Sequence, residues 1–251
     1  YRQQVRRSLP DHFFRPHLLT LGWYAVHAAI IGTGYWLLAS HFSWWLAPFV
    51  ALVVGHSFGC MGFIAHDVCH GASVRNPRWR DFWAAVGFSP LWIGPLVWRK
   101  WHNAEHHNNT QIAGEDPDHL FTMEHYQKNP VLRFLYRLSP LARNLVIFSS
   151  FAYRMTQQHL RMWLTYMVDR GTASREKVIM ALQLIVPMAF WVGVSGSIGG
   201  QVLIWGYLVP VLVANAIVIS YIATNHFLNP LADERDVLAT SLSVTLPRGL
   251  K

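Results

Sequence analysis

The sequence of 251 residues is strongly apolar, because 52% of its residues are hydrophobic and only 14% are charged. Soluble domains carry about 25% charged residues, so this composition excludes an ordinary soluble domain and indicates a membrane protein. The formal net charge of +8 is carried by segments outside the apolar runs, and we expect no nucleic-acid partner.

Four uncharged runs are long enough to cross about 30 Å of hydrocarbon. They form two pairs, and the short turn inside each pair contains no Lys or Arg. The runs lie at about 18–38, 44–64, 178–198 and 202–224. We therefore predict an all-α integral membrane protein with four transmembrane helices in two hairpins, organised as a single domain over residues 1–251.

The basic residues lie near the N-terminus, in the segment 65–177 and near the C-terminus, which is one side of the predicted membrane. The positive-inside rule makes this side cytoplasmic. We predict that 65–177 forms a helical cap on the cytoplasmic face of a multi-pass protein. Within it, Pro90 and Pro95 interrupt the apolar stretch Phe82–Val97, which favours a segment in the membrane interface; a third span is the alternative.

Two histidine motifs lie in the predicted cap. His66 and His70 form H-x-x-x-H, whereas His102, His106 and His107 form H-x-x-x-H-H. Histidines four residues apart share one face of an α-helix, so each pair can bind one metal ion. His107 is predicted to turn away from His106, and either to reach a second ion or to bridge toward it. Imidazole suits zinc, copper, iron and nickel alike, so the motifs alone predict two metal ions without naming them.

These motifs resemble those of the integral-membrane fatty acid desaturases, and the likeness extends along most of the chain in order and spacing. The matching segments are His66–Gly71, Trp101–Thr110, Asp116–Asp118, Ala223–His226 and Thr240–Val244. Hydroxylases and carotenoid ketolases share this scaffold. The three residues between the first two histidines of the second motif, and the Asn-Asn-Thr that follows, favour a desaturase.

The resemblance implies that the protein desaturates a fatty acyl chain with dioxygen at two non-haem iron ions. The acyl group would be bound to a lipid, to coenzyme A or to a carrier protein. Electrons would come from a ferredoxin or a cytochrome b5-like donor that docks on the Arg-rich cytoplasmic face. His226, at the end of the last apolar run, is a further candidate ligand. Asp67 and Asp118 are expected to accept hydrogen bonds from ligating imidazoles, and Glu105 and Asp116 are further candidates for that role.

One part of the family pattern is missing from the sequence. A third histidine box, H-x-x-H-H or Q-x-x-H-H, is expected after Thr240, but the sequence ends at Lys251 without it. Either the native chain continues past Lys251, which we expect, or the second iron site lacks ligands. The alternatives to a desaturase are a di-iron hydroxylase or ketolase acting on a lipid or carotenoid, a catalytically silent relative that binds lipid or metal, and a membrane cytochrome.

Overall fold

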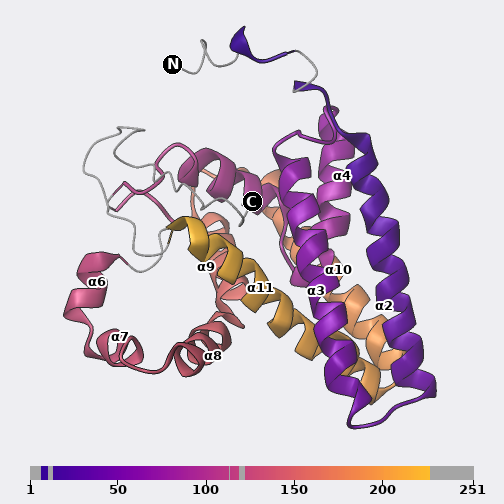
Figure 1. Ribbon diagram of the computed structural model, residues 1–251. Helices are drawn as coiled ribbons and strands as arrows, with labels where there is room; N and C mark the ends of the chain where they lie inside the picture. Colours follow the sequence, from indigo (N-terminus) through magenta and orange to yellow (C-terminus); the bar gives the residue numbers. More distant parts are fainter. Residues whose placement is uncertain (1–6, 11–13, 113, 119–121, 227–251) are drawn as a thin grey trace.

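The computed structural model describes residues 7–10, 14–112, 114–118 and 122–226, and it describes no strand in that part of the chain. Long helices form a bundle, and the short helices α6, α7 and α8 form an arc to one side of it (Figure 1). The predicted all-α class is therefore confirmed for these residues.

The first helical hairpin consists of α2 (Gly22–Ser40), preceded by the short η2 (Leu18–Leu21), and α3 (Leu46–Cys69). The two long helices pack closely because Gly34 faces α3 without a side chain. A β-carbon added there would lie 2.7 Å from a methyl group of Val54. This contact positions α3 against α2.

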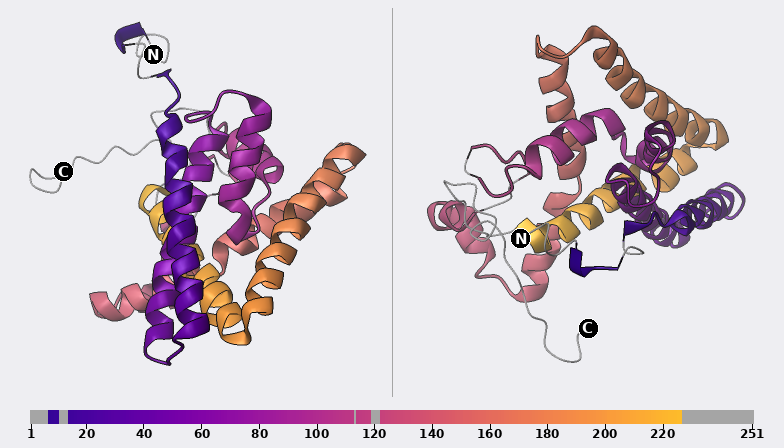
Figure 2. Two further views of the ribbon diagram at one scale, coloured as in Figure 1. Left: turned by 90° about the vertical axis from the view of Figure 1, so that its right-hand side faces the viewer. Right: turned by 90° about the horizontal axis from the view of Figure 1, so that it is seen from above.

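The second hairpin consists of α10 (Ser174–Ile198), η5 (Val202–Leu208) and α11 (Val209–His226). α11 crosses the bundle and packs along α3 (Figures 1 and 2). The helices approach closely at Gly55, where a β-carbon would lie 2.6 Å from the β-carbon of Val213. The crossing brings the last part of α11 beside the end of α3 that carries His66.

Three of the described helices are long and apolar enough to cross a membrane: Leu46–Cys69, Ser174–Ile198 and Val202–Ala223. They agree with the second, third and fourth predicted runs. The first run corresponds to α2, a helix of 19 residues that is not among the three. Its glycines and its Tyr, Trp and His residues make it less hydropathic than the others. Four spans therefore stay a prediction, whereas a membrane protein is supported.

Between the hairpins the apolar stretch 82–97 is a broken helix rather than a continuous span. α4 (Pro77–Phe88) begins at Asn76, whose side chain accepts the backbone N–H groups of Arg78 and Trp79. The chain then passes through η3 (Ser89–Leu91) and through Trp92, whose φ of +58° is left-handed. A proline cannot continue a helical hydrogen-bond ladder, so Pro90 and Pro95 account for the break.

α5 (Pro95–Trp98) continues without interruption into η4 (Arg99–His106), a π-helix that carries the second histidine motif. Four further helices complete the segment before the second hairpin. They are α6 (Met123–Lys128), α7 (Pro130–Leu135), α8 (Pro140–Phe151) and α9 (Arg154–Val168).

The turns inside the two hairpins lie at the same end of the bundle, and the ring centroids of Trp44 and Trp205 are 6.4 Å apart there. The C-terminal end of α3 and the π-helix lie at the opposite end (Figures 1 and 2). The fold therefore gathers the two histidine motifs at one end of the apolar helices, as the sequence predicts.

Candidate metal centre

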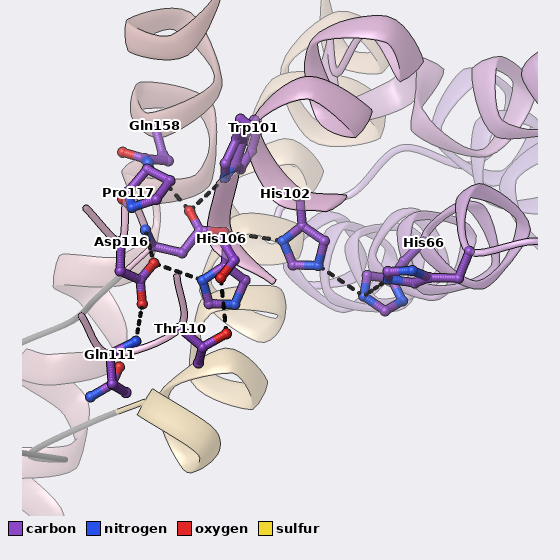
Figure 3. A network of polar contacts seen from close by, with 11 residues as sticks. His66, Trp101, His102, His106, Thr110, Gln111, Asp116, Pro117 and Gln158 are labelled. Atoms are coloured by element: carbon purple, nitrogen blue, oxygen red, sulfur yellow. Dashed lines mark hydrogen bonds and ion pairs between the residues drawn. The ribbon is translucent and has the colours of Figure 1, made fainter. Parts of the chain in front are cut away.

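The two histidine motifs, which lie more than thirty residues apart in the sequence, meet in the structure. The Nε2 atom of His66 lies 3.3 Å from Nε2 of His70 and 3.3 Å from Nε2 of His102. Two nitrogens bound to one ion at about 2.0–2.1 Å are separated by roughly 3.0–3.4 Å for ordinary bond angles. The spacing of these three imidazoles therefore fits a shared metal ion (Figure 3).

A second group of possible ligand atoms adjoins the first. His66, His70 and His102 form one group, while His102, His106 and Asp118 form another, each with its ligand atoms within 4.8 Å of one another. His102 belongs to both groups. Paired groups that share a residue are compatible with two neighbouring ions.

His107 lies with the other histidines rather than away from them. Its ring centroid is 4.7 Å from that of His102, 5.2 Å from that of His106 and 4.9 Å from that of His70. The predicted orientation of His107 assumed an α-helix, whereas the segment Arg99–His106 is a π-helix. The expected orientation was wrong, whereas binding of a second ion by His107 stays a prediction. All five histidines of the two motifs gather in one place.

Asp118 orients His102. Its Oδ2 accepts a hydrogen bond from Nδ1 of His102 at 3.1 Å, while its Oδ1 accepts from Nε1 of Trp101 at 2.6 Å and from the amide of Gln158 at 3.3 Å. A carboxylate on Nδ1 fixes the tautomer so that Nε2 keeps its lone pair for a metal. Asp67 lies 3.1 Å from Nδ1 of His66 and is placed for the same role.

Asp116 supports His106 more strongly than the sequence indicates. It is 2% exposed, and it accepts hydrogen bonds from Nδ1 of His106 at 2.7 Å and from the backbone N–H groups of Gln111 and Asp118, both at 2.8 Å. The short Asp-Pro-Asp segment thus supplies one carboxylate to each of two histidines. In the sequence, the position of this segment shortly after the second histidine motif indicates that its carboxylates orient imidazoles. Only the folded loop shows which carboxylate contacts which histidine.

The electrostatic environment keeps two of the imidazoles neutral. Burial, with the neighbouring histidines, lowers the pKa of His70 to about 4, and burial lowers the pKa of His102 to about 4 despite Asp118. Both rings therefore carry a free lone pair at neutral pH. Burial opposes a charge on His106, but the hydrogen bond to Asp116 and the nearby carboxylates raise its pKa above the usual value. Burial opposes the charge on Asp116 too, yet its bonds to His106, Gln111 and Asp118 lower its pKa.

Other predicted residues have different surroundings. Glu105 accepts a hydrogen bond from the hydroxyl of Tyr166 at 2.6 Å, so it ties the π-helix to α9 instead of orienting an imidazole. His226 ends α11, but its side chain lies outside the described residues, as does the whole segment around Thr240. The expected roles of His226 and of that segment stay predictions.

An apolar cavity of about 300 Å³ opens against the histidines. His66 and His102 form part of its wall, together with Trp98. The other lining residues are mostly apolar and come chiefly from α3, α4, η3 and α11, with Met155 from α9; they include Gly62, Phe63, Phe88, Leu91, Val218 and Ile222. A hydrocarbon chain in this cavity would lie beside the imidazoles of both histidines.

Comparison with known proteins agrees with this architecture. Over 125 residues the chain is 27% identical to a Delta(8)-fatty-acid desaturase of Euglena gracilis, and this stretch covers 48% of the chain but only 27% of that protein. Residues 42–249 match the fatty acid desaturase family. This range contains the helices from α3 to α11, both histidine motifs and the Asp-Pro-Asp segment. The chain belongs to the fatty acid desaturase family.

Proposed function

We propose that the protein introduces a double bond into a fatty acyl chain, with dioxygen, at a pair of non-haem iron ions. The observation that supports this most directly is the apolar cavity whose wall contains His66 and His102. Apolar pockets with a few convergent polar groups are typical binding sites, and here the polar groups are imidazoles with neighbouring nitrogens.

The residues present fit such a centre. His66, His70, His102, His106 and His107 would hold the ions, with His226 as a further ligand, and Asp67, Asp116 and Asp118 would orient three of the imidazoles. Bound iron supplies the activation of dioxygen that removes two hydrogens from the acyl chain.

The protein itself positions the chain and excludes water. Trp98 stacks against the ring of His102, with centroids 4.3 Å apart, and also lines the cavity. Phe88 and Leu91 are buried on the same cavity wall. These side chains would hold one carbon–carbon unit beside the histidines, because an apolar chain gains most where water is excluded.

The membrane arrangement is part of the proposal. We infer a multi-pass protein with four spans, α2 included. The histidine end is placed on the cytoplasmic side, because the basic segments of the chain lie on the same side of the predicted spans as the histidine motifs. The substrate would be an acyl group on a lipid, coenzyme A or a carrier protein. A ferredoxin or a cytochrome b5-like protein would supply electrons.

The proposal is tested by product analysis in membranes that contain the protein, an electron-donor system and saturated acyl chains. We expect a product lighter by two hydrogens, formed only with dioxygen, and no oxygen atom from ¹⁸O₂ in the lipid. A labelled hydroxyl or keto group would instead identify a hydroxylase or ketolase. Bound metal without any oxidised product would identify a silent relative.

A substitution at Gly62 tests whether the cavity holds the acyl chain. Gly62 lies one helical turn before His66, and a β-carbon there would be 3.0 Å from Cδ1 of Leu91, which also lines the cavity. Gly62→Leu is expected to fill the space and to lower the conversion of long acyl chains by about tenfold or more, while metal content is unchanged. Gas chromatography of the products measures this effect.

Gly193→Leu is the matched control, because a β-carbon at Gly193 in α10 would meet no atom within 4 Å. This variant should keep the wild-type product profile. If Gly62→Leu also keeps it, the acyl chain binds elsewhere and the cavity has another role.

A further inference from the structure

The turn that carries the second histidine motif has one residue more than an α-helical turn. The backbone N–H of His107 donates to the carbonyl of His102 at 3.0 Å, which is an i→i+5 hydrogen bond. The whole segment Arg99–His106 has this π-helical form. π-helices are rare and are found frequently at functional sites, so the turn calls for a physical explanation.

The wider turn changes which side chains share a face. In an α-helix, the residues three and four positions after His102 would lie on its face, which are Glu105 and His106. In a turn closed by an i→i+5 bond, the residues four and five positions after His102 lie on its face instead. These residues are His106 and His107. The observed rings agree, because both lie within 5.1 Å of the His102 ring centroid.

Side chains of the turn and of the residues that follow it donate to backbone carbonyls of the turn and of α3. The amide of Asn108 donates to the carbonyl of Ala104 at 2.7 Å, and the hydroxyl of Thr110 donates to the carbonyl of His106 at 2.9 Å. The amide of Asn103 donates to the carbonyl of Cys69, which joins the turn to the end of α3. The Asn-Asn-Thr that follows the histidines therefore caps the π-helix.

We propose that the extra residue of the π-turn is a positioning element that brings His107 into one ligand set with His102 and His106. We take the exposed Ala104 as this extra residue. In this arrangement H-x-x-x-H-H in a π-turn is equivalent to H-x-x-H-H in an α-turn. The proposal rests on the proposed metal centre and adds the cause of its geometry.

Changing the length of the turn tests this equivalence. Deletion of Ala104 shortens the spacing to H-x-x-H-H, which an α-helix would present on one face, so the variant should bind Co²⁺ with wild-type stoichiometry. Insertion of a second alanine after Ala104 should move His106 and His107 off the face of His102 and weaken Co²⁺ binding by more than about 100-fold, because two ligands are displaced rather than a supporting partner. The measurements are metal content and the visible Co²⁺ spectrum of the purified full chain, with gel filtration to check folding.

A second pair of variants keeps the chain length and decides the question if the shortened chain does not fold. Glu105→His combined with His107→Ala retains three histidines but places them at the α-helical positions. We expect this variant to lose Co²⁺ binding as His107→Ala does, whereas Glu105→Gln alone should retain it, because the amide oxygen can still accept the hydrogen bond from Tyr166. Wild-type binding by the double variant would show that the turn is α-helical and would overturn the proposal.

The two levels of the proposal fail differently. If the wild-type chain binds no Co²⁺, the metal centre itself is wrong. If the wild-type chain binds Co²⁺ but the insertion, or the double variant, binds it equally well, the centre stands and the role of the π-turn is refuted.

Discussion

Replacing His102 with alanine is expected to abolish metal binding and acyl desaturation together. His102 belongs to both groups of possible ligands, and its Nε2 lies 3.3 Å from that of His66. Its loss would remove a possible ligand from both groups. Because the loss of a supporting partner alone costs about 10–100-fold in metal affinity, the loss of this ligand should cost more than about 100-fold.

Metal analysis of the purified variant, together with the yield of unsaturated product, measures this effect. His41→Ala is the matched control, since His41 is exposed at the opposite end of the bundle, where α2 ends. It should retain full metal content and activity. A His102→Ala variant with the wild-type metal content would contradict the assignment of the centre.

Replacing Asp116 with alanine is expected to damage both stability and metal binding. The carboxylate is buried and accepts hydrogen bonds from His106, Gln111 and Asp118. Removing one partner of such a buried pair costs about 3–5 kcal/mol, because the remaining polar groups stay buried without a partner. The affinity for metal should also fall by about 10–100-fold, since the orientation of the His106 ring is no longer fixed.

The change in the free energy of unfolding is measured in detergent on the metal-free protein, and the metal affinity by titration with Co²⁺. Glu124→Ala is the control, because Glu124 forms an exposed ion pair with Lys128 on α6, and solvent screens such pairs so that they contribute little to stability. A loss of stability at Asp116 no larger than at Glu124 would show that the buried carboxylate is dispensable.

Much of the fold follows from the sequence, because the length and polarity of a run are local properties. The runs at 44–64, 178–198 and 202–224 correspond to helices that can cross a membrane. Pro90 and Pro95 coincide with the break in the helix, while the position of this segment in the membrane interface stays a prediction. The run at 18–38 corresponds to α2, which is helical but contains many residues of intermediate polarity and is not among the helices that are apolar enough to cross a membrane. The membrane class therefore needed no tertiary information.

The sequence also identifies the histidines of the candidate centre, because imidazoles spaced four residues apart at the ends of apolar helices are typical of metal ligands. It could not assign their partners. Asp116 could equally have been solvated, and the contact between Glu105 and Tyr166 joins residues 61 positions apart. Such pairings depend on how a loop and α9 pack against the π-helix, which no local pattern encodes.

By itself, the sequence determined the membrane setting, the positions of the long apolar helices and the residue types that could bind metal. Only the tertiary structure decided the form of the turn from His102 to His107, and therefore the direction of His107. The α-helix is the default for such a segment because its i→i+4 hydrogen bonds form locally. A π-turn persists where side-chain contacts compensate. Here Asn103 of the turn donates to the carbonyl of Cys69 at the end of α3, and Glu105 accepts from Tyr166 of α9. The side chains of Asn108 and Thr110 donate to carbonyls of the turn.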